Sequence, residues 1–399
     1  MRYRRRFGGR TSFSVIASGQ EPNEPTLGEM RIIFLTAESY YMPGARVRSY
    51  GFCRILKKFG INAQVLSMAD DLSALDGANL YLMGNIVRLR LVEKTLTLLK
   101  NMGDIKVVCQ RAKYPALAAY LLNIMKNTPI VFDYDDWELD LENFFLINRI
   151  PLLKKITSTA ELTIRLIRKS EACISASRFL EKYLKTCHPN VHYIPTVVDS
   201  DRFHPKVVPK NRDKISLVWT GLVWGESIYR AILDFAKGLN HAITKGANVK
   251  LVLIGGGVWM PPLQNAITNH FPRLELAVEN WAHPDKMADK LQEMDIGLMP
   301  LPEDPAISKW VDSKSPTKMF EFMAVGMPII GSDRGEVKEI ITHGVDGFLC
   351  SNSSQIADAV MALQDPTLRR RMGESARQKV VSFYSEKAIA QKLVDAIVR

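Results

Sequence analysis

The chain has 399 residues, 47% of them hydrophobic and 24% charged, which is typical of a folded globular protein large enough for two or three domains. No apolar run approaches the roughly 20 residues of a membrane-spanning helix, so we expect no such segment. The net charge of +11 is uneven, because residues 30–206 carry 25 Lys and Arg against 17 Asp and Glu, whereas residues 207–399 carry 23 against 22. A basic first half predicts either an anionic partner or a solvated basic surface.

The cysteines indicate the compartment. Five are scattered along the chain (Cys53, Cys109, Cys173, Cys187 and Cys350), and no pair has the spacing of a metal or redox site. Their odd number and spacing predict reduced thiols in a cytoplasmic protein.

Strand and helix patterns alternate along most of the chain. Residues 1–29 are polar and rich in Arg, and we expect a disordered basic tail, with Met30 as an alternative start. In the first half, strand patterns occupy residues 31–38, 62–68, 79–84, 105–110, 129–135, 171–177 and 190–199. In the second half, they occupy residues 215–221, 249–257, 274–281, 295–301, 328–333 and 347–350. Such alternation favours α/β domains with parallel sheets covered by helices.

The alternation stops once, in the polar, proline-containing residues 199–214, which we interpret as a linker. We therefore expect two Rossmann-like domains, at residues 30–205 and 206–380, with sheets facing across a cleft. A final helix at residues 381–399 is expected to pack back towards the first domain. Ligands of parallel sheets bind beyond the carboxyl ends of the strands, so functional residues should follow strands.

One buried helix carries an unexpected polar stripe. In the segment SPTKMFEFMAVGMPII, residues 315–330, Ser315 is expected to cap a helix that Gly326 ends. Thr317, Lys318 and Glu321 lie on one face of this otherwise apolar helix. A helix start beside a lysine predicts a phosphate site, and the glutamate one turn further could accept hydrogen bonds from sugar hydroxyls. The alternative is an edge helix with a surface Lys–Glu pair.

The same stretch resembles the donor-site signature of retaining GT-B glycosyltransferases, the large family 4 group, in which a glutamate opens the pattern E-x-M-A-x-G-x-P. The matching positions are Glu321, Gly326, Pro328, Gly335, Glu339 and Gly347. Further similar segments follow in the family's order at residues 42–60, 130–139, 172–184, 191–203, 215–221, 251–257 and 295–301. The resemblance covers most of residues 30–399 and implies a GT-B fold.

The resemblance also implies roles for the helix start. Glu321 would bind the ribose of a nucleoside-diphosphate sugar, and the amides of residues 315–318, including Ser315 and Thr317, would contact the diphosphate. Lys318 would stabilise the leaving group. The family's earlier glutamate, which touches the donor sugar, is replaced here by Ser313, with Asp312 beside it.

Other donor positions follow the strands of the second half. Gly221 follows the first strand, but the basic pair that usually clamps the diphosphate there is missing. Arg46 and Arg48, after Gly44 in the first loop, are candidates to supply that charge across the cleft. The resemblance places Gly256 near the donor and Trp281 near the base, and either residue could instead be purely structural.

The segment FDYDDW offers carboxylates at the end of a strand. Asp133 and Asp135 form a D-x-D pattern, which binds a metal in GT-A enzymes but is weak evidence alone. In the resemblance, Asp135 and Asp136 lie near the reacting sugar, and we expect them to orient the acceptor or the donor sugar. We expect no metal and no tightly bound cofactor, because the helix start performs part of a metal's role.

The expected function is transfer of a sugar, with retention, from a nucleoside-diphosphate sugar to a glycan, lipid-linked or small-molecule acceptor. A sugar-nucleotide epimerase and a non-catalytic scaffold subunit remain alternatives. Residues 143–170 mix apolar residues with cations and either rest on an anionic membrane or form an ordinary helix pair. We expect a cytoplasmic protein, with peripheral association to the inner membrane face as an option, and no nucleic-acid partner.

Overall fold

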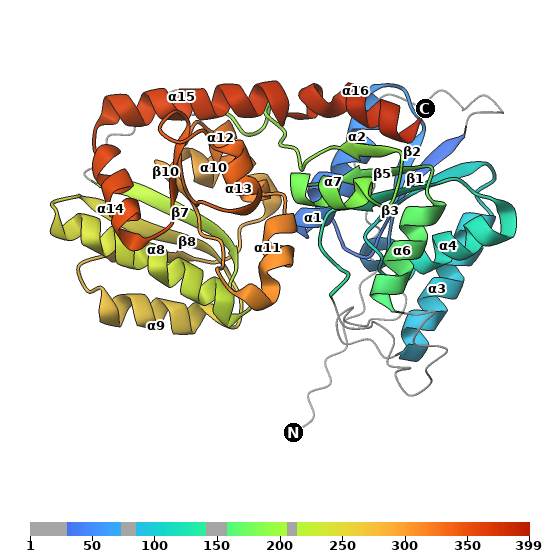
Figure 1. The fold of residues 1–399 in the computed structure, drawn as a ribbon, viewed down its shortest axis with the longest axis horizontal. Helices are drawn as coiled ribbons and strands as arrows, with labels where there is room; N and C mark the ends of the chain where they lie inside the picture. Colours follow the sequence, from blue (N-terminus) through green and yellow to red (C-terminus); the bar gives the residue numbers. More distant parts are fainter. Residues whose placement is uncertain (1–29, 73–84, 141–157, 206–213) are drawn as a thin grey trace, which may run out of the picture.

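The computed structural model describes residues 30–72, 85–140, 158–205 and 214–399. These residues form two domains side by side, each built on one parallel sheet (Figure 1). The expected tail at residues 1–29, the strand pattern at 79–84 and half of the linker, residues 206–213, lie outside the described residues.

The amino-terminal domain is a six-stranded parallel sheet in the order β2-β1-β3-β4-β5-β6. Its strands are β1 (Arg31–Thr36), β2 (Ala63–Ser67), β3 (Ile105–Gln110), β4 (Ile130–Tyr134), β5 (Ala172–Ser175) and β6 (Val191–Tyr193). Its helices are α1 (Pro43–Ala45), α2 (Gly51–Lys58), α3 (Asn85–Lys100), α4 (Tyr114–Lys126), α6 (Thr159–Lys169) and α7 (Arg178–Lys185). Arg46–Tyr50 and Met68–Leu72 are short π-helical turns.

The carboxyl-terminal domain is a second six-stranded parallel sheet, in the order β12-β11-β10-β7-β8-β9. Its strands are β7 (Ile215–Leu222), β8 (Val249–Gly256), β9 (Glu275–Glu279), β10 (Ile296–Met299), β11 (Ile329–Ser332) and β12 (Gly347–Cys350). Its helices are α8 (Glu226–Thr244), α9 (Met260–His270), α10 (Pro284–Gln292), α11 (Ser308–Ser313), α12 (Thr317–Ala324), α13 (Gly335–Ile340), α14 (Ser353–Ala362) and α15 (Pro366–Phe383). A 3₁₀ turn, η5, covers Pro305–Ile307.

This architecture confirms the predicted fold class of two Rossmann-like domains. All six strand patterns of the second half form strands. The strand order reverses between β7 and β10, which leaves a crevice beyond their carboxyl ends. The chain segments that follow β7 and β10, together with the start of α12, lie at this crevice.

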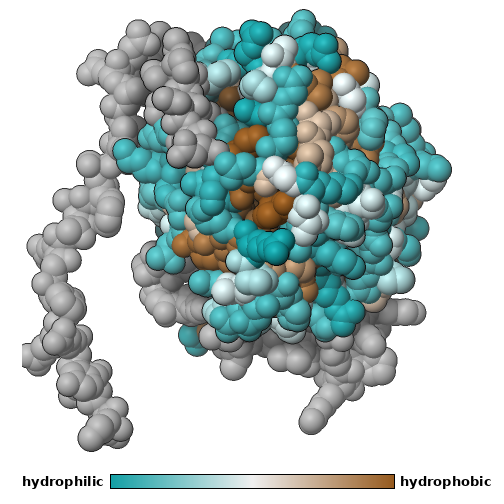
Figure 2. Space-filling view, turned by 90° about the vertical axis from the view of Figure 1, so that its left-hand side faces the viewer, coloured by the Kyte–Doolittle hydropathy of each residue, from teal (hydrophilic) through white to brown (hydrophobic). Residues whose placement is uncertain are grey.

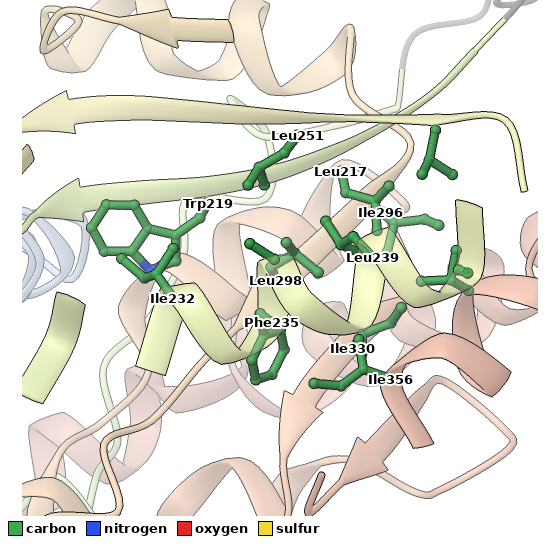
Figure 3. Close-up of a cluster of buried hydrophobic side chains, with 14 of the residues drawn as sticks. Leu217, Trp219, Ile232, Phe235, Leu239, Leu251, Ile296, Leu298, Ile330 and Ile356 are labelled. Atoms are coloured by element: carbon green, nitrogen blue, oxygen red, sulfur yellow. The ribbon is translucent and has the colours of Figure 1, made fainter. Parts of the chain in front are cut away.

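The core of the carboxyl-terminal domain fixes the position of β7. Successive side chains of β7 point to opposite faces of the sheet. Leu217 and Trp219 face α8, and Val218 between them faces the other side. Figure 3 shows the α8 side, where strand side chains pack against Phe235 and Leu239. Trp219 is 3% exposed, and its ring links this core to the carboxyl end of β7.

The chain crosses between the domains twice, and the two crossings meet. Val198 N–H donates to the Tyr384 carbonyl at 3.0 Å, and Glu386 N–H donates to the Val198 carbonyl at 3.2 Å. After this bridge, α16 (Glu386–Ile397) leaves the carboxyl-terminal domain and packs beside α2 (Figure 1). The Glu386 carboxylate pairs there with Arg54 and Lys58, which ties the last helix to the first domain.

Figure 2 views the end of the molecule formed by α8, α9 and α14, and it shows a mainly hydrophilic surface with separate hydrophobic patches. Within the described ranges, no helix is both long and apolar enough to cross a membrane.

Gly373 of α15 packs against Gly326 and Pro328, in the turn between α12 and β11. A Cβ at this position would lie 2.1 Å from the Gly326 carbonyl oxygen, which is backbone and cannot rotate away. We expect Gly373→Ala to lower the free energy of unfolding by about 1–3 kcal/mol, although alanine favours a helix intrinsically. Urea denaturation measures this loss. Gly256→Ala is the control, because a Cβ there meets no atom within 4 Å; equal stability of the two variants would contradict the packing.

Candidate functional site

A cavity of about 370 Å³ lies between the two domains, at the carboxyl ends of β4, β7 and β10. From the amino-terminal domain, it is lined by Pro43, Gly44, Arg48, Arg111, Asp135, Asp136 and Thr196. From the other domain, its polar and aromatic lining residues are Trp219, Trp224, Trp281, Trp310, Lys314, Ser315, Thr317 and Lys318, and Gly221 lines it as well. Its volume suits a small-molecule ligand, and both predicted walls contribute to it.

The start of α12 faces this cavity. The helix begins at Thr317 with Pro316 as its capping residue, and no side chain caps its first turn. The prediction that Ser315 is the cap is therefore wrong. The Ser315 hydroxyl instead accepts a hydrogen bond from Thr196 N–H of the other domain at 3.0 Å. A first turn without a side-chain cap directs amide dipoles at the cavity, which favours an anion.

Lys318 places an ammonium group beside this helix start. Its Nζ donates to the Thr220 carbonyl at the end of β7 and lies 4.3 Å from the centroid of the Trp219 ring. Among the described residues, no carboxylate lies within ion-pairing distance of it. Burial lowers the pKa of Lys318 to about 7, and the neighbouring Lys314 charge adds to this while Glu321 opposes it.

Gly221 is required for this arrangement. Its φ of +144° suits glycine, and a Cβ would lie 2.8 Å from Lys318 Nζ and 3.2 Å from the Trp219 ring. Gly256 does not line the cavity; the glycines on either side of it, Gly255 and Gly257, pack against the backbone of the β7 segment.

Glu321 lies beside this cavity rather than in it. The residue is 8% exposed, and together with Arg46 and Arg202 it lines a smaller cavity of about 50 Å³. Arg46 of the other domain approaches the Glu321 carboxylate, with Nη2 3.8 Å from Oε1. Burial raises the pKa of Glu321, while the charges of Arg46, Arg202 and Lys318 oppose that rise. The carboxylate thus lies one helical turn from Lys318, between the two domains.

Aromatic side chains line part of the cavity. Trp224 and Trp310 form an edge-to-face pair with ring centroids 5.2 Å apart, and Lys314 Nζ lies 3.8 Å from the Trp310 centroid. Trp224 and Trp281 are half-exposed at the cavity. Such large, partly exposed rings are suited to stacking on a base or a sugar ring.

Carboxylates of the loop after β4 form the opposite wall, and an arginine holds them. Arg111 donates to both oxygens of Asp135, at 2.5 and 3.1 Å, and its Nη2 lies 3.1 Å from Asp136 Oδ2. Arg111 also pairs with Glu38 at 3.2 Å. The Arg111 charge holds the pKa of Asp135 at about 2 despite burial. Asp136 receives a second cation from the other domain, because Lys314 Nζ lies 2.8 Å from its Oδ1.

Both carboxylates of the D-x-D pattern, Asp133 and Asp135, form ion pairs with arginines. Arg48 is 1% exposed and donates through Nε to both oxygens of Asp133, at 3.0 and 2.8 Å. Arg48 therefore lines the cavity with its charge already compensated. Within the residues that the structure describes, no group of three or more His, Cys, Asp and Glu side chains could hold a metal ion.

Ser313 and Asp312 do not line the cavity. Ser313 is fully buried, and its hydroxyl accepts a hydrogen bond from Trp137 N–H of the other domain at 3.0 Å. Asp312 pairs with Arg334 at 2.9 Å. Ser313, for which the resemblance implies a sugar-contacting position, therefore makes a contact between the domains.

Sequence reasoning missed two cations of this site, Arg111 and Lys314. Arg111 follows β3 directly and adopts a φ of +63°, which is uncommon outside glycine. Its position directly after a buried strand is the sequence feature that could have indicated a site residue. Lys314 precedes the predicted helix start by one residue, and nothing in the sequence indicates its partner Asp136.

Two other regions do not contribute. A larger groove of about 670 Å³ lies on the carboxyl-terminal domain between α8, η5 and α14, and contains none of the predicted site residues. Of the predicted membrane segment, residues 143–157 lie outside the described residues. The described helix α6 buries its apolar side chains Leu162, Leu166 and Ile167 in the core, so this face is not available to a membrane.

Comparison with known proteins identifies the second domain. Residues 215–365 match the family model described as glycosyl transferases group 1. Over these residues, the chain is similar to the glycosyl transferases group 1 family. A curated relative, N-acetyl-alpha-D-glucosaminyl L-malate synthase of Bacillus anthracis, is 30% identical over 166 residues. The aligned stretch spans 41% of this chain and only 40% of that relative.

Solved structures extend the likeness to both domains. HepE of Anabaena, in complex with UDP-glucose, has a TM-score of 0.67 at 14% identity and covers 93% of this chain and 100% of its own. Sucrose-phosphate synthase of Thermosynechococcus elongatus has a TM-score of 0.66 at 14% identity, covering 92% and 98%. The galactosyltransferase WaaB has a TM-score of 0.61 at 17% identity, covering 92% and 99%. At these identities the likeness shows the fold alone, which is GT-B.

The lowered pKa of Lys318 makes a prediction about stability. Between its folded value of about 7 and the ordinary lysine value near 10.5, the unfolded chain binds more protons than the folded chain. Raising the pH through this window therefore increases the free energy of unfolding, whereas below pH 7 the cost of the buried charge is constant. In Lys318→Met we expect this increase to be absent. Urea denaturation at pH 6, 8 and 9.5 measures it, with the exposed Lys182→Met as control; parallel pH profiles for Lys318→Met and the native chain would contradict the buried ammonium.

Proposed function

We propose that this chain is a retaining glycosyltransferase that moves a sugar from a nucleoside-diphosphate sugar to an acceptor hydroxyl. The observation that carries the proposal is the Lys318 ammonium beside the α12 start, facing a cavity between two Rossmann-like domains. The match of residues 215–365 to glycosyl transferases group 1 supports it. Helix dipole and ammonium together favour a diphosphate at this point.

In the proposed reaction, the bond between the anomeric carbon and the diphosphate oxygen breaks, and a bond from that carbon to the acceptor oxygen forms. The acceptor proton leaves with the departing diphosphate or to water. Negative charge develops on the diphosphate, where Lys318 and the α12 amides stabilise it. Closure of the domains excludes water, which would otherwise hydrolyse the donor.

The proposed donor is a uridine-diphosphate sugar, because the similar HepE structures are complexes with UDP, and with UDP-glucose. Glu321, one turn beyond Lys318, would accept hydrogen bonds from the ribose, which requires Arg46 to share or release its carboxylate. Trp281 would lie near the base. Ser313 and Asp312 point away from the cavity, so recognition of the donor sugar passes to residues of the opposite wall, foremost Asp135 and Asp136.

The acceptor would bind on the amino-terminal wall, beside Gly44 and the two aspartates. The cations of this wall are each paired: Arg48 with Asp133, and Arg111 with Asp135, Asp136 and Glu38. This balance favours an uncharged, hydroxyl-bearing acceptor, such as a glycan, over a dicarboxylate. A lipid-linked glycan would place a cytoplasmic protein peripherally at the inner face of the membrane.

A thermal-shift screen with nucleoside diphosphates tests the function. We expect UDP at 100 times its Kd to stabilise the native chain by about 2.7 kcal/mol. Lys318→Met and Glu321→Ala should each weaken UDP binding by about 10- to 100-fold, since each removes a charged partner of the nucleotide. The exposed Glu374→Ala is the control and should bind as the native chain does. Binding of no nucleotide would contradict the proposal and favour a non-catalytic scaffold.

A further inference from the structure

The site lacks the cation pair that the resemblance leads us to expect after β7. Between Gly221 and Tyr229 the chain contains no Lys or Arg. Arg230, the next cation, is exposed, pairs with Glu226 and lies in the separate groove beside α8. A diphosphate that bridges two sugars carries two negative charges, and it gains a third as it departs, so Lys318 alone leaves the leaving group under-compensated.

Among the described residues that line the cavity, four are Lys or Arg: Arg48, Arg111, Lys314 and Lys318. Arg48 is fully buried against Asp133, and Arg111 is shared among three carboxylates. Neither can turn to a ligand without leaving a buried carboxylate unpaired, which is costly. Lys314 differs, because its side chain is 35% exposed and it holds a single carboxylate oxygen, Asp136 Oδ1.

Lys314 is also placed where the phosphates are expected. It directly precedes Ser315 and the α12 start, and it lines the same cavity wall as Lys318. The two ammonium groups are near enough that the Lys314 charge contributes to lowering the pKa of Lys318. Two like charges held together at one wall repel each other until an anion binds between them.

Release of Lys314 from Asp136 costs little. Asp136 keeps Arg111, whose Nη2 lies 3.1 Å from the other carboxylate oxygen, so the aspartate does not become an unpaired buried charge. The Lys314 ammonium also rests on the Trp310 ring, 3.8 Å from its centroid, and can turn from there. The pair with Asp136 spans the cavity from one domain to the other.

We propose that Lys314 is the second cation of the diphosphate site, and that donor binding transfers its ammonium from Asp136 to the diphosphate. This inference rests on the proposed function. The exchange frees Asp136 Oδ1 to accept a hydrogen bond from the acceptor hydroxyl, so binding of the donor prepares the acceptor wall.

The test is calorimetric titration of the full chain with UDP. Lys314→Met should weaken UDP binding roughly tenfold, since a charge-assisted hydrogen bond is lost, and Lys314→Arg should restore most of it. Binding of uridine, which has no phosphate, should not change. Asp136→Asn should strengthen UDP binding about two- to fivefold, because Lys314 is no longer held by a carboxylate. In Lys314→Met/Asp136→Asn this gain should disappear.

Lys309→Met is the matched control. Lys309 lies on α11, pairs with Asp140 across the domains at 3.6 Å and does not line the cavity. Its UDP affinity should equal that of the native chain. If UDP binds and Lys314→Met leaves its affinity unchanged, or if the gain from Asp136→Asn persists without Lys314, the inference is overturned while the proposed function stands. If no nucleoside diphosphate binds the native chain, both are overturned.

Discussion

The structure depends on one partly desolvated ammonium group. Lys318 lies over the Trp219 ring and donates to the Thr220 carbonyl, at the point where the strand order of the second sheet reverses. Trp219 is part of the domain core, and Gly221 provides the space that the ammonium occupies. When Lys318 is protonated, the core therefore holds a positive charge that lacks a carboxylate partner among the described residues, and burial disfavours that charge. An anion at the start of α12 would relieve this cost, which makes the unfavourable charge useful for binding.

On the amino-terminal wall of the cavity, the charged side chains are paired with one another. Arg48 and Arg111 therefore fix the positions of carboxylates rather than offering charge to a ligand. The two walls are held in register by neutral contacts, such as Trp137 N–H to Ser313, and by the ion pair of Lys314 with Asp136. Of these, the ion pair is the more exposed, and a ligand can rearrange it at low cost. The bridge between Val198 and Ser385 joins the two crossing segments around which the domains are connected.

Much of this arrangement follows from local sequence patterns. Short apolar runs separated by helical patterns predict the strands, several of which are buried at every position. The polar stripe of Thr317, Lys318 and Glu321 predicts the helix that faces the cavity, because a buried helix rarely carries such a stripe without a polar neighbour. Pairings between distant segments could not be derived in this way. Arg48 and Asp133 are 85 residues apart, and Lys314 and Asp136 are 178 apart, and each pair depends on how the strands are ordered. Arg111 was missed because a positive φ, which aims its side chain, has no signal in a single sequence outside glycine and asparagine.

Proton uptake on nucleotide binding tests the central claim most directly. At pH 8 UDP is itself fully ionised, whereas Lys318, with a pKa of about 7, is mostly neutral in the free protein. Calorimetric titrations of UDP in phosphate and in Tris, which differ in ionisation enthalpy, should therefore reveal uptake of most of one proton, and this uptake should be lost in Lys318→Met. Equal heats in the two buffers, or uptake that persists without the lysine, would contradict the account.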